Sequence, residues 1–483
     1  MTTRRTLQRG VGALILGMAF AAGLVLCGGL LLSDPELTKP IEHGAVFGVW
    51  TLLYSSAAPS VQMVVVAVAV ALLVAAAVAG AEHRISTRYR RSGDTVATPL
   101  APRVVMAATA GRYDGEVTVT VLIPAHNEAD RIGATLRSIW YQDSPPERVV
   151  VVADNCTDAT EEVARFHGAD VVHTEGNTHK KAGALNQALE LLLPTLGEND
   201  TVLVMDADTV LSPAYIATVR RRMTDDRALM AVGGLFLGEE GSGLLGQMQR
   251  NEYTRYCRDI SRRRGRLFVL TGTASVFRSR ALREVAAHRG TALPGRPGEV
   301  YDTVSLTEDN EITLALKTLG ALMTSAPQCR VVTEVMPTWG ALWAQRLRWQ
   351  RGALENLGAY GLTPQTVRYW AQQMGIGYGV VALSSYAVLV VVTALSLDSV
   401  VLFPFWMGLG AVFAVERLVS VWAGGWRARL LGALLIPELV YACVLNAVYV
   451  RGVFDLLMGR RAEWKHVVTD ASGRVKVEEG ELV

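Results

Sequence analysis

Two carboxylates stand directly after a short apolar run near the middle of the chain. The run 202–205 (VLVM) is followed by Asp206, Ala207 and Asp208. An apolar run of this length is typical of a central strand in an α/β sheet, and ligands of such sheets bind beyond the carboxyl ends of the strands. Two carboxylates there can hold a divalent cation, and the cation can hold a diphosphate. Taken alone, the triplet is also compatible with a solvated loop.

Acidic residues also follow the two apolar runs that come earlier in the chain. The run 117–123 (VTVTVLI) leads to Glu128, and the run 148–153 (RVVVVA) leads to Asp154 and Asp158. Because parallel strands end at the same edge of a sheet, these carboxylates are expected to line one cleft, where they can bind a uracil imide or a ribose hydroxyl. Alternatively, Asp154 and Asp158 cap the next helix, and capping by Asp158 is compatible with ligand binding by Asp154.

Two lysines open a predicted helix. Lys180 and Lys181 precede the stretch 182–186 (AGALN). A helix N-terminus with lysine beside it attracts phosphate, and small side chains let a ligand approach the backbone. A solvated lysine pair is the alternative for this stretch.

Acidic, basic and aromatic residues recur in two later stretches, 307–309 (TED) and 345–349 (QRLRW). The carboxylate of Asp309 can take the proton from an attacking sugar hydroxyl. An arginine of the second stretch can neutralise charge on a departing diphosphate, and an indole face can stack on a sugar ring. Each of these side chains is ambiguous by itself, but their order along the chain is not.

The composition is that of a membrane protein. Half of the 483 residues are hydrophobic and the mean hydropathy is +0.26, for which membrane spans are the simplest explanation. The net charge of +2 favours neither nucleic acid nor an acidic partner. The five cysteines are scattered and form no Cys-x-x-Cys pair, which argues against a disulfide framework or a zinc site and fits a reducing compartment.

Charge-free apolar runs flank the central part of the chain. Residues 11–32 and 61–81 form a predicted hairpin, and its basic flanks put both ends in the cytoplasm. A signal peptide is the alternative for 11–32, but this run is longer than the ~7–15 apolar residues that such peptides use. Three more runs, 376–397, 400–421 and 430–450, follow the central part. Three spans would carry the basic tail outside, against the positive-inside tendency, unless one of the weaker runs lies in the interface.

The sequence therefore predicts six segments. They are an N-terminal transmembrane hairpin (1–91), a linker (92–115), a cytoplasmic catalytic domain (116–340), an amphipathic interfacial segment (341–375), C-terminal transmembrane helices (376–458) and a polar tail (459–483). Packing against the soluble domain is the alternative for the amphipathic helix. Within the central domain, further strands at 169–172 and 201–205 alternate with helices at 157–166 and 181–193, which predicts a largely parallel α/β sheet.

In their order, these motifs resemble those of the family 2 glycosyltransferases that are built into membranes: the synthases of cellulose, hyaluronan, chitin and poly-N-acetylglucosamine. The matching motifs are Pro124 to Glu128, Asp154 with Asp158, Lys181 to Asn186, Asp206 to Asp208, Gly272 with Thr273, Thr307 to Asp309, and Gln345 with Arg348 and Trp349. Together they cover residues 118–352. Seven motifs in this order make the resemblance specific.

The resemblance implies a GT-A (Rossmann-like) domain between transmembrane helices, Mg²⁺ or Mn²⁺ as cofactor, and transfer by single displacement with inversion at the anomeric carbon. It implies donor contacts from Ala125, Glu128, Asp154, Lys181, Asp206, Gln345 and Arg348. It implies acceptor contacts from Gly272, Thr273, Glu308 and Trp349. Asp208 would hold the metal, and Asp309 would be the general base.

Three functions remain open at this point. The first is a processive synthase in the plasma membrane, which polymerises a UDP-activated sugar and secretes the β-linked product. The compact chain resembles the poly-N-acetylglucosamine and hyaluronan synthases more than the longer cellulose synthases, which favours N-acetylglucosamine over glucose. The second is transfer of a single sugar to a lipid acceptor, and the third is a transport or scaffold protein that only binds nucleotide sugar. The chain lacks a recognisable cyclic-dinucleotide-binding domain, and residues 464–469 suggest a gating loop only faintly.

Overall fold

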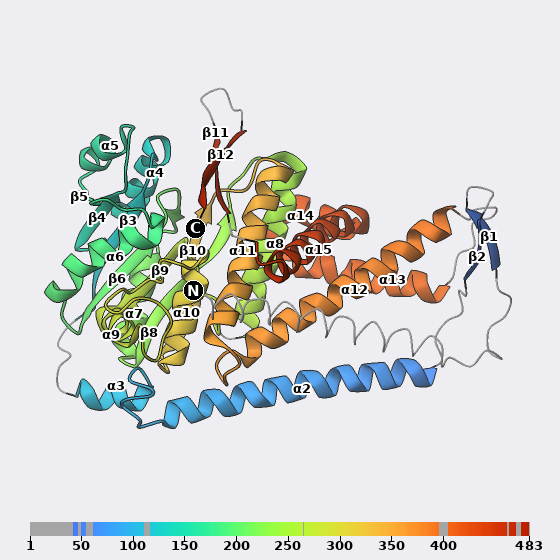
Figure 1. Cartoon of the computed structure of the whole chain (residues 1–483), viewed down its shortest axis with the longest axis horizontal. Helices are drawn as coiled ribbons and strands as arrows, with labels where there is room; N and C mark the ends of the chain where they lie inside the picture. Colours follow the sequence, from blue (N-terminus) through green and yellow to red (C-terminus); the bar gives the residue numbers. More distant parts are fainter. Residues whose placement is uncertain are drawn as a thin grey trace. The chain divides into compact units, whose positions relative to one another are not determined.

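The computed structural model describes residues 42–46, 50–54, 61–110, 116–263, 265–395, 404–460, 463–469 and 475–482. The chain divides into two compact units (Figure 1). One unit lies within 1–84 and 367–460, and the other within 85–366 and 461–483. The second unit contains the predicted site residues.

An eight-stranded mixed sheet forms the centre of this second unit. Its strand order is β5-β4-β3-β6-β9-β8-β10-β7. The strands are β3 (Thr118–Ala125), β4 (Arg148–Ala153), β5 (Asp170–His173), β6 (Asp200–Met205), β7 (Val210–Leu211), β8 (Leu229–Gly238), β9 (Ala274–Arg278) and β10 (Leu322–Thr333). The first four strands in the order run parallel, as predicted.

The prediction of a largely parallel sheet is confirmed, because β8 and β10 run in the same direction as β3, β4, β5 and β6, and two strands of the described sheet are reversed. Strand β9 is antiparallel to both β6 and β8, and β7 is antiparallel to β10. The chain enters β9 from the carboxyl end of β6, where the backbone N–H of Asp206 donates to the carbonyl of Thr273 at 3.1 Å. Residues 206–273, which include β7 and β8, separate β6 from β9 in the sequence, so this antiparallel pair is a long-range pairing.

Helices cover both faces of the sheet (Figure 1). Helices α4 (Ala129–Trp140), α5 (Thr160–Phe166) and α7 (Tyr215–Asp225) pack on one face. Helices α6 (Lys180–Leu192), α9 (Ser279–His288) and α10 (Glu308–Thr318) pack on the other. In β6, Leu203 and Met205 belong to the first core and Val202 and Val204 to the second, because successive side chains of a strand point to opposite faces. Burial on both faces explains the continuous apolar run before Asp206.

Three helices and a hairpin complete this unit. They are α3 (Pro102–Ala108), α8 (Gly243–Arg262), α11 (Trp339–Tyr360) and the antiparallel pair β11 (Glu463–Thr469) and β12 (Val475–Leu482), with a short 3-10 turn, η2, at Leu193–Thr195. Helix α11 corresponds to the predicted amphipathic helix. It belongs to the same compact unit as the sheet and buries Ala341, Leu342, Leu354 and Leu357, so packing on the soluble domain is confirmed. Its contact with a membrane surface stays a prediction.

The first unit is mainly helical. It contains the hairpin β1 (Glu42–Val46) and β2 (Trp50–Tyr54), most of α2 (Val61–Arg91), and α12 (Val367–Leu395), α13 (Pro404–Ser420), η3 (Trp422–Gly424), α14 (Gly425–Ala433) and α15 (Leu435–Leu457). The hydroxyl of Tyr449 on α15 donates to the carbonyl of Gln373 on α12 at 3.0 Å, which ties these two helices together.

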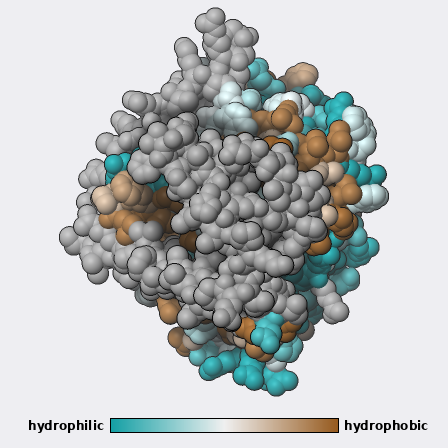
Figure 2. Space-filling model, turned by 90° about the vertical axis from the view of Figure 1, so that its right-hand side faces the viewer, coloured by the Kyte–Doolittle hydropathy of each residue, from teal (hydrophilic) through white to brown (hydrophobic). Residues whose placement is uncertain are grey.

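Among the described residues, α15 is the one helix with the length and composition needed to cross a membrane. Several brown, hydrophobic patches are exposed on the face of the molecule shown in Figure 2. The predicted span 11–32 lies outside the described residues, and the spans 376–397 and 400–421 lie partly outside them. The multi-pass topology therefore stays a prediction.

Candidate functional site

Three strand ends meet at one edge of the sheet, as the sequence predicts. Strand β3 lies between β4 and β6 and is parallel to both, so Ala125, Asp154 and Asp206 stand on neighbouring strands. The backbone N–H of Asp154 donates to the carbonyl of Ala125 at 2.9 Å. Glu128 directly precedes the first residue of α4 at the same edge.

Hydrogen bonds hold the carboxylate of Asp154 in one orientation. Its Oδ1 accepts from the Thr174 hydroxyl at 2.8 Å, from Asn155 Nδ2 at 3.1 Å and from Asn177 Nδ2 at 2.8 Å. The residue is buried, with 7% of its surface exposed. Sequence reasoning missed Thr174 and Asn177. One local signal could have indicated Asn177: an asparagine shortly before a helix often forms an Asx turn. In the structure, its Oδ1 accepts from the backbone N–H of His179 at 2.9 Å.

Asp158 serves as a cap, as the alternative interpretation of the sequence proposed. Its carboxylate accepts from the backbone N–H of Thr160, in the first turn of α5, at 3.0 Å. It also accepts from the N–H of Ala129, at the start of α4, at 3.1 Å. One carboxylate therefore satisfies amide groups at the starts of two helices.

Left-handed backbone conformations mark this edge of the sheet. Among the described residues, four that are not glycine have positive φ, and three of them, Asn127, Asn155 and Lys180, lie here. Such conformations cost energy and are found preferentially at functional sites.

The structure explains why a glycine stands at position 183, which the sequence did not reveal. A Cβ at this position would meet Asn177 Oδ1 and lie 2.8 Å from the Cβ of His179, so the glycine accommodates the Asx turn.

Lys181 connects the strand-end edge with the TED stretch. Its Nζ lies 2.6 Å from Asp206 Oδ1 and 2.9 Å from Glu308 Oε1. Burial disfavours the charge on this amine, but the two carboxylates outweigh it and raise the pKa of Lys181. Burial likewise opposes ionisation of Glu308, but Lys181 and then Arg348 outweigh it and lower its pKa. Glu308, an expected acceptor contact, is thus engaged in an ion pair.

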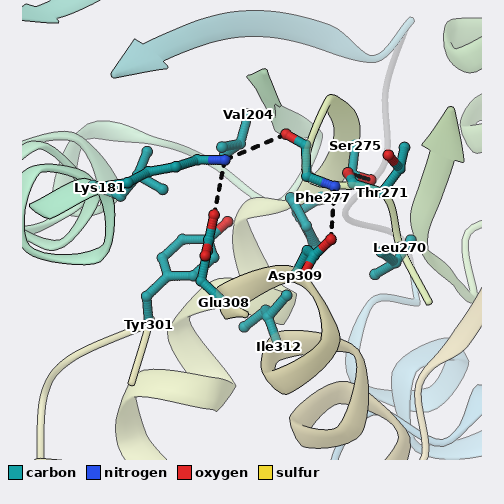
Figure 3. A pocket seen from close by; sticks show the side chains of 12 residues that line it. Lys181, Val204, Leu270, Thr271, Ser275, Phe277, Tyr301, Glu308, Asp309 and Ile312 are labelled. Carbon is teal, nitrogen blue, oxygen red and sulfur yellow. Dashed lines mark hydrogen bonds and ion pairs between the residues drawn. The ribbon is translucent and has the colours of Figure 1, made fainter. Parts of the chain in front are cut away.

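Asp309 lies beside this ion pair (Figure 3). Its Oδ2 accepts from the backbone N–H of Gly272 at 3.3 Å, and its Oδ1 accepts from the N–H of Asn310 at 2.7 Å. Burial and the neighbouring carboxylate of Glu308 raise the pKa of Asp309 to about 6. A carboxylate with a pKa near the operating pH is suited to general base catalysis.

These groups and residues of the hydrophobic core line one small pocket (Figure 3). Lys181, Glu308 and Asp309 line its polar side, and Gly272 lines it as well. Its other walls are mostly apolar: Leu185, Val204, Leu270, Phe277, Tyr301 and Ile312. These walls account physically for the desolvation that raises the pKa of Asp309.

Helix α11 brings basic and aromatic side chains of the QRLRW stretch into this compact unit. The positive charge of Arg348 helps to lower the pKa of Glu308 and partly opposes the rise in the pKa of Asp309. The guanidinium of Arg346 lies 4.2 Å from the centre of the Trp349 ring and forms a 2.8 Å ion pair with Glu252 on α8. Gln345 has a buried amide oxygen. Arg346 and Glu252 were not predicted as site residues.

Comparison with known proteins identifies this domain. The family description "Glycosyltransferase like family 2" matches residues 116–352. The chain carries a family 2 glycosyltransferase domain. It is 26% identical over 249 residues to poly-beta-1,6-N-acetyl-D-glucosamine synthases of Staphylococcus epidermidis and Staphylococcus aureus, covering 50% of this chain and 55% of theirs. The chain thus spans about half the length of the curated relatives it matches.

Solved glycosyltransferase structures are also similar to the chain. A mannosyltransferase from Pyrobaculum calidifontis, solved with GDP-Man and Mn²⁺, is 18% identical, with a TM-score of 0.48 and coverage of 80% of this chain and 98% of that one. Glucosyl-3-phosphoglycerate synthase from Mycobacterium tuberculosis, solved with Mn²⁺, UDP-glucose and phosphoglyceric acid, is 19% identical, with a TM-score of 0.35 and coverage of 56% and 86%.

The carboxylates of the family 2 domain suit a divalent cation that the substrate also helps to hold. Burial and the charges of Asp206 and Glu334 raise the pKa of Asp208 to about 7, so a cation beside this carboxylate would relieve unfavourable negative charge. Within the described part of the chain, no three His, Cys, Asp or Glu side chains could hold a metal by themselves. Mg²⁺ and Mn²⁺ take one or two carboxylates and complete their shell with phosphate and water, and Asp208 supplies one such carboxylate.

We expect Asp208→Asn to weaken metal use in the family 2 domain. Metal ions supply several kcal/mol of charge stabilisation in such reactions, so sugar transfer should fall on the order of a hundredfold or more. The measurement is release of the nucleoside diphosphate at increasing Mn²⁺ concentrations, and EDTA gives the rate without metal. Asp225→Asn, an exposed acid at the end of α7, is the control. An unchanged Mn²⁺ midpoint in Asp208→Asn would contradict the assignment.

Proposed function

We propose that the protein is a processive, inverting glycosyltransferase. It transfers N-acetylglucosamine or glucose from a UDP-sugar to a growing β-linked polysaccharide and secretes the polymer across the membrane in which it lies. The observation that carries this proposal is the placement of Asp309. This half-buried carboxylate lies next to the ion pair of Lys181 with Glu308, and the same lysine reaches Asp206 at the strand-end edge.

Asp309 acts as the general base in this proposal. It takes the proton from the acceptor hydroxyl, whose oxygen attacks the anomeric carbon of the donor while the bond to UDP breaks. Attack from the side opposite the leaving group inverts the configuration, so an α-linked donor yields a β-linked product. The raised pKa of Asp309 supports this role, because the carboxylate is a stronger base than a solvated one and is still mostly ionised at neutral pH.

The strand-end edge binds the nucleotide of the donor. Asp154 and Glu128 contact the uridine, and Asp206 contacts the nucleotide beside Lys181. Burial and the neighbouring Asp208 raise the pKa of Glu128 to about 7, which allows its carboxyl group to donate a hydrogen bond to a ligand when protonated. When bound to Asp208, Mg²⁺ or Mn²⁺ offsets negative charge on the diphosphate, and Arg348 and Gln345 complete that site.

The acceptor end lies beside Trp349. The indole stacks on the terminal sugar of the polymer, with Gly272 and Thr273 nearby, and repeated transfer follows when the product stays bound and shifts by one sugar. The family 2 domain supports polysaccharide synthesis. The relatives named poly-beta-1,6-N-acetyl-D-glucosamine synthases support N-acetylglucosamine as the sugar. The apolar helix α15 and the charge-free runs 11–32 and 61–81 support a plasma-membrane enzyme with a cytoplasmic catalytic domain.

Release of UDP by the purified full chain tests the proposal. UDP-N-acetylglucosamine, UDP-glucose and UDP-glucuronate are supplied in turn with Mg²⁺ or Mn²⁺ in lipid nanodiscs, and the products are sized. Long products from one donor support the synthase and name its sugar. A single sugar on extracted lipid would replace it with the lipid-acceptor function. Donor binding without turnover would contradict catalysis and leave a binding or scaffold function.

We expect Trp349→Ala to shorten the polymer rather than stop the first transfer. An aromatic contact of about 1 kcal/mol corresponds to roughly fivefold weaker retention of the acceptor, and processive length falls with retention. Product size and initial UDP release are measured together. Trp343→Ala, which truncates another tryptophan on the same helix, is the control. Unchanged product length in Trp349→Ala would contradict sugar stacking.

A further inference from the structure

One face of α11 meets the first turn of α10. Arg348, Gly352, Asn356 and Tyr360 are spaced four residues apart along α11 and therefore share one face of the helix. The last three contact α10 or the residue before it, and the charge of Arg348 acts on Glu308 and Asp309. The helix that carries the QRLRW stretch is thus joined directly to the helix that carries Asp309 (Figure 1).

Asn356 forms most of the polar contacts in this joint. Its Nδ2 donates to the backbone carbonyl of Thr307 at 3.3 Å, to the Thr307 hydroxyl at 3.2 Å and to Asn310 Oδ1 at 3.0 Å. Its Oδ1 accepts from the Ser305 hydroxyl at 2.9 Å. Asn356 is almost completely buried, with 1% of its surface exposed. One amide therefore holds residues on both sides of Asp309.

Gly352 sets the distance between the two helices. A Cβ at this position would lie 2.6 Å from Thr307 Cγ2 and 3.0 Å from Thr307 Cβ. The side chain of Thr307 occupies the space that the missing Cβ leaves free. Any larger residue at position 352 must push the TED stretch away from α11, because real Cβ atoms do not approach other atoms so closely.

A buried ion pair anchors the far side of the same turn. Arg289 Nη1 lies 2.5 Å from Glu311 Oε1 and is completely buried. The hydroxyl of Tyr360 donates to Glu311 Oε1 at 2.5 Å. Since Glu311 lies two residues after Asp309, α10 is fixed both to α11 and to the segment after α9. The first turn of α10 has little freedom to move on its own.

We propose that Gly352 and Asn356 are positioning residues that fix Asp309 relative to Arg348 and Trp349. This inference rests on the proposed function, because it treats Asp309 as the base. Arg348 and Trp349 lie on α11, whereas Asp309 lies on α10, so the joint between the helices sets the separation of base, diphosphate and acceptor. Catalysis depends steeply on such distances, and a displacement of about 1 Å can cost a hundredfold in rate.

Gly352→Ala tests this inference because alanine favours the helix and removes no polar group. We expect kcat for sugar transfer to fall at least tenfold, while the affinity for UDP, measured by calorimetry, stays within about twofold. Adding Thr307→Ala removes the two atoms nearest to the new Cβ, Oγ1 and Cγ2 of Thr307, and should restore part of the lost kcat. Gly340→Ala is the matched control, since a Cβ at this other glycine of α11 meets nothing within 4 Å.

Asn356→Asp keeps the shape of the side chain but removes its donors, and it should also lower kcat without weakening UDP binding. If Gly352→Ala does not fold, Asn356→Asp alone tests whether the joint positions Asp309. Wild-type kcat in both variants, or an equal loss of kcat and UDP affinity, would overturn the inference. An absence of transfer by the wild-type chain with every donor would contradict the proposed function instead, so the two failures are distinguishable.

Discussion

Replacement of Asp309 by Asn is expected to abolish sugar transfer while the donor still binds. General base catalysis contributes about 10²–10⁴-fold, and an amide cannot take the acceptor proton. Asparagine has nearly the same shape, and its oxygen can still accept from the N–H of Gly272. UDP release and product formation measure the loss, and calorimetry with UDP measures donor binding.

Asp200→Asn is a suitable control for this change. Asp200 lies at the other end of β6 and accepts hydrogen bonds from the Thr118 hydroxyl and from the N–H of Gly197, at 2.6 Å for the latter. Its replacement perturbs the same sheet without touching the proposed base. Full transfer by Asp309→Asn would show that another group takes the proton.

The pH dependence of the wild-type rate gives a second check on Asp309. The group is active as a carboxylate, and its pKa is raised to about 6, so kcat should be constant above pH 7 and fall about tenfold per unit well below pH 6. Saturating donor and Mn²⁺ keep the carboxylates of the donor site occupied during the titration. A rate that stays flat down to pH 4.5 would contradict the assignment of this base.

The parallel strands β3, β4 and β6 could be predicted because they are buried on both faces. Such strands read as continuous apolar runs, and the predicted bounds of β4 match the structure while those of β6 differ by one residue. The placement of Asp154 and Asp206 at one edge of the sheet, on either side of the end of β3, then followed from the common direction of β4, β3 and β6. The antiparallel direction of β9 could not be predicted, because a short apolar run does not indicate whether a strand is parallel or antiparallel to its neighbours.

The contacts between α10 and α11 could not be predicted from the sequence either. Gly352, Asn356 and Tyr360 have no chemistry in common, and each reads separately as an ordinary residue of a helix. Only the position of Thr307 against α11 reveals why a glycine and a buried amide stand there. Likewise, the role of Gly183 depends on Asn177, which folds back over it from outside the helix.

Lys181→Met is expected to impair both stability and transfer. Lys181 Nζ lies within 3 Å of carboxylate oxygens of Asp206 and Glu308, at 2.6 and 2.9 Å. Removal of a buried counter-ion leaves the remaining charges uncompensated, at a cost on the order of 3 kcal/mol for largely buried groups. Thermal unfolding measures the first effect. UDP release, expected to fall on the order of a hundredfold or more because the donor edge and the base stretch lose their connection, measures the second.

A second substitution separates these two effects. In Lys181→Met with Glu308→Gln, one of the two uncompensated carboxylates becomes neutral, so most of the lost stability should return. Transfer should not return, because the link between the Asp206 edge and the TED stretch is still missing. Lys181→Arg, which keeps a cation between the carboxylates, should retain more activity than either variant. If the double variant regained wild-type transfer, Lys181 would act only as a stabilising counter-ion, and the two halves of the site would be positioned by the joint between α10 and α11 alone.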